Sequence, residues 1–246
     1  MTGRMNGIAG IVPTGSLEIT ENGTYDVTEY AECVVDVTEP VPDLPPGYSL
    51  LNYIQNSQLS STYTNGRQYL NTGEYTGVND KIYIKFQILS DLTKLEYHNC
   101  RLFGVSQDAG GGTNLTVITY GTSGLNCRFG DASTNLQYSG GVAELIIDLK
   151  NKTLTFNGVE QPFAYSEDFT QSQACRLFAS YDLSSNSVKE SNRAQAKIWS
   201  YKHWRNDVLI QDFVPCLNAN NVPVYRDVIN GTDYTSVEGT AFSIYG

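Results

Sequence analysis

The sequence predicts an all-β protein: a two-sheet antiparallel jelly-roll sandwich with a small N-terminal β-hairpin module. Three observations favour this class. Tyr, Gly, Asn, Ser and Thr are abundant, and the Ala-Leu-Glu-Lys composition of helical proteins is missing. Short runs of alternating apolar and polar residues recur, with turn residues between them about every 8–12 residues. The 246 residues suffice for one large domain and a small appendage.

The N-terminal part of the chain predicts three short segments. Residues 1–15 predict a flexible or docking segment. Residues 16–38 hold alternating runs around Asn22-Gly23, a hairpin turn signal, and predict a small β-hairpin module. That module is too small to hold a core alone, so we expect it to dock on its own domain, on a sister subunit or on a larger assembly, as an anchoring module. Residues 39–47 contain four prolines and predict a semi-rigid linker.

Residues 48–246 predict the jelly-roll domain. Residues 81–88 (KIYIKFQI) alternate strictly, which is typical of a half-buried strand. Residues 115–120 and 125–130 predict neighbouring strands across a GTSG turn. Residues 143–161 predict a long hairpin with turns at its KNK and Asn-Gly sequences.

The segment 212–234 holds a cysteine, several aspartates and an Asn-rich turn, but it predicts closing strands rather than a reactive cluster. Phe213 and Val214 are expected to finish a strand that Pro215 ends. Residues 218–221 predict a turn, after which Tyr225 returns to the core.

Charge and hydropathy argue against two classes of partner. The formal net charge is −10 and no basic run exists, so neither a nucleic acid nor an anionic membrane surface is expected. No stretch has the roughly 18 apolar residues needed to span a bilayer. The first residues lack the apolar region of a signal peptide, so we expect the chain to be made and first folded in a cytoplasm.

The cysteines and acidic loops predict no resident cofactor or metal. The absence of CxxC favours buried free thiols over a disulfide framework or a zinc site. Calcium stays open as an alternative, because loop oxygens at Asp80, Asp108 or Asp131 could bind it, although no EF-hand loop is present. The five cysteines are Cys33, Cys100, Cys127, Cys175 and Cys216.

Two stretches together resemble a known family. Residues 53–87, with GRQYLNTG at their centre, resemble the opening strand pair of concanavalin A-like (laminin-G-like) jelly-roll domains from virion and surface proteins of gut bacteria and their phages. Residues 196–236, with DFVPCLN followed by PVYRD, resemble the matching close. Residues 16–38 are similar to a small β module of the same phage-type proteins.

The resemblance implies this fold and a setting, a phage particle or a cell surface, and brings no conserved active site. The missing signal peptide and the missing acid pair favour a non-enzymatic virion structural protein of the capsid-decoration, head-fibre or tail-fibre type, assembled in the host bacterial cytoplasm. The N-terminal module would contact other virion proteins, and a homo-oligomer is expected, for which our guess is a trimer. The jelly roll would present a surface for host or mucosal glycans. The alternative is a bacterial carbohydrate-binding lectin or a surface protein related to glycoside hydrolases.

The search for catalytic residues predicts no enzyme. Glycoside hydrolysis needs two carboxylates about 5–9.5 Å apart, and the E-x-D-x-x-E strand of hydrolases with this fold is missing. Glu144 and Asp148 share a strand face, but four residues separate them by roughly 13 Å. Only nearness in sequence links Cys216 to His203, and Cys216 is expected to be a buried thiol.

The candidate binding residues are aromatic, because sugars stack on exposed aromatic faces. In residues 195–201, strict alternation would bury Ile198 and Ser200 and turn Trp199 and Tyr201 to the opposite face. Trp204 is expected in or near the following turn. An outward Trp is either a sugar platform or is covered by a loop or a neighbouring subunit. The candidate glycan-binding residues are Trp199, Tyr201, Trp204, Tyr120 and Tyr138.

Overall fold

The structure is a computed structural model of the chain. It describes residues 42–56, 68–89, 101–106, 115–120, 124–165, 173–183, 186–188, 195–237 and 241–242, without the side chains of residues 106 and 118–120. The chain divides into two units, Met1–Asp43 and Leu44–Gly246. The predicted segments 1–15 and 16–38 lie outside the described residues, as does the start of the predicted linker 39–47.

The described residues form strands and no helix, in two sheets. Sheet A has the order β11 (Val159–Pro162), β10 (Thr153–Phe156), β9 (Ala143–Asp148), β4 (Asp80–Ile88), β15 (Ala196–Arg205), β16 (Val208–Leu217), β17 (Pro223–Asp227) and β18 (Thr232–Tyr234), with β1 (Ser49–Leu50) beside β16 and β2 (Ile54–Gln55) beside β15.

Sheet B has the order β14 (Ser187–Val188), β13 (Tyr181–Asp182), β5 (Arg101–Ser106), β6 (Leu115–Tyr120), β7 (Gly124–Phe129) and β8 (Ala132–Gln137), and β12 (Arg176–Leu177) joins β5 to β3 (Leu70–Asn71). Strand pairs are antiparallel, apart from the parallel pair of β5 and β13. The predicted all-β class with two antiparallel sheets is confirmed, whereas the jelly-roll connectivity stays a prediction.

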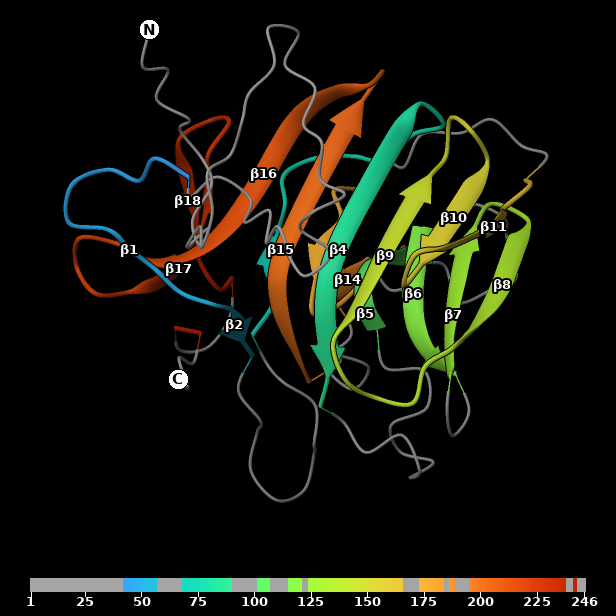
Figure 1. Ribbon diagram of the computed structural model, residues 1–246, viewed down its shortest axis with the longest axis horizontal. Helices are drawn as coiled ribbons and strands as arrows, with labels where there is room; N and C mark the ends of the chain where they lie inside the picture. The colour runs from blue at the N-terminus through green and yellow to red at the C-terminus, as the bar shows by residue number, and fades with distance from the viewer. Residues whose placement is uncertain are drawn as a thin grey trace, which may run out of the picture. The chain divides into compact units, whose positions relative to one another are not determined.

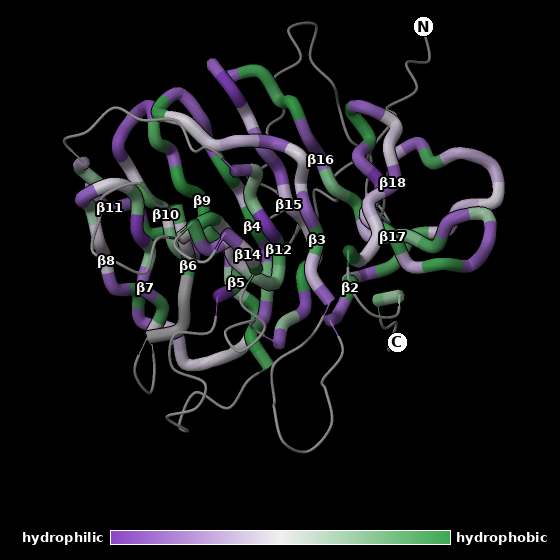
Figure 2. The backbone as a smooth tube through the Cα atoms, turned by 180° about the vertical axis from the view of Figure 1, so that it is seen from behind, coloured by the Kyte–Doolittle hydropathy of each residue, from purple (hydrophilic) through white to green (hydrophobic). Residues whose placement is uncertain are grey.

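The two sheets enclose one apolar core. Figure 1 shows β16, β15, β4 and β9 of sheet A in front of β5, β6 and β7 of sheet B. Hydrophobic and hydrophilic residues alternate along these strands (Figure 2). The inward residues of β4, predicted as a half-buried strand, are buried, and they pack in the same core as Phe103 of β5 and Phe129 of β7. Burying each large side chain stabilises the fold by about 1.5–3 kcal/mol.

Several local predictions are confirmed. β6 and β7 pair along their whole length. The predicted hairpin forms β9 and β10, and Lys152 (φ 55°) and Asn157 (φ 48°) adopt the left-handed backbone that its tight turns need. Cys127, Cys175 and Cys216 are buried free thiols, while Cys33 and Cys100 lie outside the described residues.

The predicted alternation in β15 is wrong after Ile198. Ile198 pairs with Phe86 and Ser200 pairs with Lys85, so Trp199 is an extra residue in a β-bulge. Every later side chain therefore changes face. Tyr201 is fully buried instead of pointing outward, and Ser200 is half-buried instead of belonging to the core.

The predicted strand end at Pro215 is also wrong. β16 continues to Leu217, and Pro215 pairs with Tyr225 of β17. The carbonyl of Pro215 accepts a hydrogen bond from the amide of Leu51, which follows β1. The backbone N and C=O of Pro215 therefore point toward the β1 side of β16 and away from β17. The missing N–H of proline therefore removes no hydrogen bond between β16 and β17.

Candidate functional site

The candidate site lies where β4 begins and the β15–β16 hairpin turns. Asn206 (φ 52°) and Asp207 (φ 66°) form the turn, and both adopt the left-handed backbone of a two-residue type I′ hairpin, which Asn and Asp tolerate well. The tight turn sets the register, so that Arg205, the last residue of β15, lies opposite Asp80, the first residue of β4.

Asp80 is the buried anchor of this site. Its carboxylate accepts hydrogen bonds from Arg205 (Nε–Oδ1, 3.2 Å; Nη2–Oδ2, 3.3 Å), from the amide of Gly77 (3.0 Å) and from Nε2 of His203 (2.9 Å). Burial raises the pKa of Asp80, but the hydrogen bonds from His203 and Arg205 outweigh it and hold the pKa below its usual range. Asp80 is therefore ionised at neutral pH.

Arg205 neutralises a second carboxylate. Its Nη1 lies 3.1 Å from Oε2 of Glu74, and its Nη2 donates to the carbonyl of Tyr75 (2.5 Å). Burial lowers the pKa of Arg205, and the hydrogen bond and charge of Asp80 more than reverse this effect. One guanidinium thus holds two acids and the backbone of residues 74–75 in a fixed arrangement.

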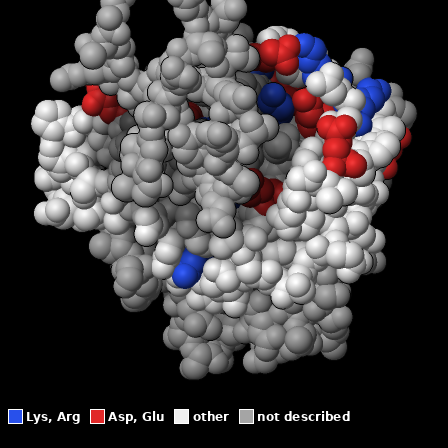
Figure 3. Space-filling view, in the orientation of Figure 1, with Lys and Arg blue, Asp and Glu red and all other residues white. Residues whose placement is uncertain are grey.

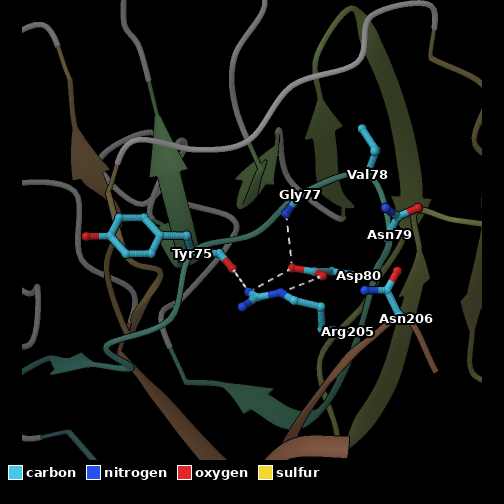
Figure 4. A pocket seen from close by; sticks show the side chains of 7 residues that line it. All are labelled: Tyr75, Gly77, Val78, Asn79, Asp80, Arg205 and Asn206. Atoms are coloured by element: carbon cyan, nitrogen blue, oxygen red, sulfur yellow. Dashed lines mark hydrogen bonds and ion pairs between the residues drawn. The ribbon is translucent and has the colours of Figure 1, made fainter. Parts of the chain in front are cut away.

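A cavity of about 330 Å³ opens beside this network. Figure 4 shows the side chains of Asn79 and Asn206 next to each other on one side, and Tyr75 on the other with its ring turned away from Arg205. The backbone of the two strands is also joined here, since the amide of Asn206 donates to the carbonyl of Asn79. The lining residues are Tyr75, Gly77, Val78, Asn79, Asp80, Arg205 and Asn206.

The two carboxamides are the groups of this cavity that remain available to a ligand. In the described part of the chain, neither the Asn79 nor the Asn206 side chain forms a hydrogen bond, whereas Asp80 and Arg205 saturate each other. A carboxamide both donates and accepts hydrogen bonds. The cavity therefore suits a small, uncharged, polyhydroxylated molecule better than an ion.

The surface around the turn carries both signs of charge. Figure 3 shows Lys, Arg, Asp and Glu side chains intermixed over the ends of β4, β9 and β10. Lys150 forms an exposed ion pair with Asp207, and the ammonium of Lys81 lies 4.9 Å from the ring centroid of Trp204. Opposite charges placed this closely create no strong field of one sign.

The predicted aromatic residues are not gathered at one site. Trp199 and Trp204 are both half-buried; Trp199 packs on Tyr53 with ring centroids 5.1 Å apart, and Trp204 contacts Lys81 at the other end of β15. The bulge at Trp199 explains why two tryptophans an odd number of residues apart both lie away from the buried face.

Two of the predicted aromatic residues, Tyr138 and Tyr201, are buried and are not surface platforms. Tyr201 is buried because of the bulge, so its prediction as an outward-facing sugar ligand is wrong. Tyr138 is also buried, and its hydroxyl accepts from the amide of Ile88 and donates to the carbonyl of Gly141. It closes the core instead of facing a loop ligand. The side chain of Tyr120 lies outside the description.

The residues considered for metal binding do not converge. Both oxygens of Asp80 face Arg205 or His203, and an anion neutralised in this way is a poor calcium ligand. Asp131 is exposed, and Asp108 lies outside the described residues. Among the described residues, no group of three or more His, Cys, Asp or Glu side chains is placed to hold a metal ion.

The residues considered for catalysis are engaged elsewhere. Glu144 forms an ion pair with Lys85 (2.9 Å), and Asp148 accepts hydrogen bonds from Asn151. Burial raises the pKa of Cys216 to about 11, so it is a neutral thiol. The partner of His203 is Asp80, 123 residues away in sequence, and not Cys216.

Sequence reasoning missed Tyr75, Asn79 and Asn206. The Asn206-Asp207 turn was a local signal that could have marked one side of the cavity. Comparison with known proteins does not identify the chain: no model of a protein family matches it, and a search of curated proteins finds no match. The described residues contain no helix long and apolar enough to cross a membrane.

Proposed function

We propose that this chain is a non-enzymatic carbohydrate-binding protein and a structural component of a phage virion. The observation that carries the binding role is the cavity beside Arg205. Two Asn side chains that form no hydrogen bond among the described residues line it, next to the charges of Arg205, Asp80 and Glu74, which are paired with one another. Sugar hydroxyls pair well with carboxamides, and a volume of about 330 Å³ is at the lower end for small-molecule sites. One sugar unit is the ligand that fits best.

The absence of catalysis is part of the proposal. Glycoside hydrolysis needs one protonated and one free carboxylate. Glu74 and Asp80, the two acids paired with Arg205 beside the cavity, share one guanidinium, and the pKa of Asp80 is lowered, not raised. A carboxylate of lowered pKa is ionised at neutral pH and has no proton to donate as a general acid, so we expect binding without turnover.

The virion setting rests on the resemblance of residues 53–87 and 196–236 to concanavalin A-like domains of phage and gut bacterial proteins. In this proposal the N-terminal segment 16–38 docks on other virion proteins, and the sandwich projects its cavity toward host or mucosal glycans. A homo-oligomer, for which we guess a trimer, would multiply weak contacts with single sugar units.

The binding test uses the intact chain on an array of neutral glycans. Asn79→Ala and Asn206→Gly should each weaken binding about tenfold, because each removes one hydrogen-bonding side chain from the cavity. Glycine at position 206 keeps the left-handed turn. The matched control is Asn221→Gly, since Asn221 (φ 59°) is an exposed turn asparagine between β16 and β17.

Two results would contradict the proposal. Unchanged binding in both cavity variants would remove the cavity from the function, and glycosidase turnover that Glu74→Gln abolishes would make the chain an enzyme. The setting is tested separately by sedimentation of the chain with purified phage particles. Glycan binding without association to particles would favour the bacterial lectin alternative.

A further inference from the structure

A second arginine lies across residues 74–75 from Arg205. Arg176 belongs to β12, and the amide of the preceding Cys175 donates to the carbonyl of Glu74 (3.0 Å). Arg176 is only 8% exposed. Its Nη1 donates to Oδ1 of Asn71 (2.7 Å) and to the carbonyl of Ala174, and its guanidinium lies 5.2 Å from the ring centroid of Tyr181.

The charge of Arg176 is not neutralised by any residue that the structure describes. No carboxylate among the described residues forms an ion pair with it, and its buried Nε has no hydrogen-bond partner in this part of the chain. Arginine is seldom buried to this degree without a charged partner. Burial lowers the pKa of Arg176, and the nearby Tyr69 hydroxyl only partly offsets this effect. A guanidinium this strongly basic stays charged all the same.

We propose that Arg176 binds the carboxylate of an acidic sugar, at a site bordered by Asn71, Tyr75 and Tyr181. The proposal rests on the carbohydrate-binding role proposed above and adds a separate site for an acidic sugar to the cavity that suits a neutral one. A planar guanidinium with an unused Nε can form two parallel hydrogen bonds to a carboxylate. A single buried positive charge matches a ligand with a single negative charge.

Tyr75 connects the two sites. Its carbonyl is bound to Arg205, while its ring is turned away from the Arg205 cavity and its hydroxyl is near enough to Arg176 to interact with it electrostatically. The side chain is 47% exposed and forms no hydrogen bond among the described residues. Tyr75 can therefore turn aside to admit a ligand to Arg176 without breaking such a bond.

The net charge of −10 sharpens this inference. An acidic protein repels anions at long range, so general electrostatic attraction does not explain anion binding here. Binding must come from short-range contacts at Arg176. It should consequently depend on this one residue far more than on the other basic residues of the surface.

The test compares glucuronic acid with glucose by calorimetric titration of the intact chain at fixed pH and ionic strength. The wild type should bind glucuronate at least tenfold more tightly than glucose, and Arg176→Gln should abolish this preference while glucose binding remains. The matched control is Arg226→Gln, because Arg226 also lies over a tyrosine ring, that of Tyr48, but is paired with Asp233 (2.9 Å). The control should keep the preference.

A second measurement needs no variant. In the ¹⁵N spectrum of the wild type, glucuronate should shift the Nε resonance of Arg176 and leave that of Arg226 in place. An unshifted Arg176 resonance, or equal affinity for glucuronate and glucose, would overturn the inference, and acetate binding as tightly as glucuronate would refute its sugar part. Failure to bind any sugar would instead refute the proposed function.

Discussion

Arg205 and Arg176 flank the same short stretch, residues 74–75, yet the protein treats their charges in opposite ways. The side chain of Arg205 is 39% exposed and is paired with both Asp80 and Glu74. Arg176 is far more buried and has no carboxylate partner among the described residues. The more exposed charge is neutralised twice, whereas the more buried charge has no counter-charge in the part of the chain that the structure describes.

This difference separates a structural arginine from one kept for a ligand. Arg205 fixes the start of β4 against the end of β15 and shapes the cavity through its bonds to Asp80 and Tyr75. Arg176 costs stability, because a buried charge without a counter-charge is unfavourable. A local loss of folding stability is common at sites that bind a ligand.

The largest effect in this comparison should come from Asp80→Asn. The substitution takes the charge from a buried carboxylate that accepts hydrogen bonds from Arg205, His203 and the amide of Gly77. A hydrogen bond to a charged group contributes about 1.5–3 kcal/mol to the free energy of unfolding, so we expect a loss of at least that size. Urea denaturation at pH 7 measures the loss. The control is Asp207→Asn, which removes a solvent-exposed pair with Lys150 and should leave the free energy of unfolding nearly unchanged. A loss below about 1 kcal/mol for Asp80→Asn would show that Arg205 is not a structural arginine.

Acidification should reduce the contribution of the ionised Asp80 carboxylate to the free energy of unfolding. Because the pKa of Asp80 is lower in the folded protein than in the unfolded chain, its stabilisation is complete above the unfolded value near pH 4 and is lost as the pH falls through the folded value. The gap in unfolding free energy between wild type and Asp80→Asn should therefore narrow below about pH 4. Urea denaturation at several pH values checks this, and a gap that widens on acidification would contradict it.

The sequence was most informative where one strand determines its own pattern. The alternation of β4 and the turn residues of the β9–β10 hairpin act over a few residues, so the elements could be predicted from them. The bulge at Trp199 could not, because one extra residue in a strand leaves no compositional mark and is decided by pairing with β4. That single residue moved Tyr201 from the surface to the core.

The candidate site was harder to predict because it depends on pairing between distant segments. Asp80 and Arg205 are 125 residues apart, and only the register of β4 against β15 brings them together. Arg176 was equally hard to predict, since the lack of a carboxylate partner among the described residues depends on its surroundings and not on its own segment. Sequence reasoning therefore found the conspicuous tryptophans before the inconspicuous asparagines and arginines.

Arg176→Met should have an effect of the opposite sign to Asp80→Asn. Replacing an uncompensated buried charge by an apolar side chain of similar length is expected to leave stability unchanged or raise it by about 1 kcal/mol. The lost hydrogen bonds to Asn71 and Ala174 limit the gain. Arg226→Met removes the arginine that is paired with Asp233, so this variant should instead be destabilised in the same urea experiment. A strongly destabilised Arg176→Met would mean that Arg176 serves the fold and not a ligand.

The smallest effect should come from Glu74→Gln, which divides the two partners of Arg205. The Glu74 side chain is 36% exposed, so its pair with Arg205 is screened by water and should contribute only about 0.2–1 kcal/mol. A double-mutant cycle of Glu74→Gln with Arg205→Lys measures this coupling. A parallel cycle of Asp80→Asn with Arg205→Lys should give a coupling several times larger. Equal couplings would mean that burial does not decide the strength of the two pairs, and the contrast between Arg205 and Arg176 would then lose its physical basis.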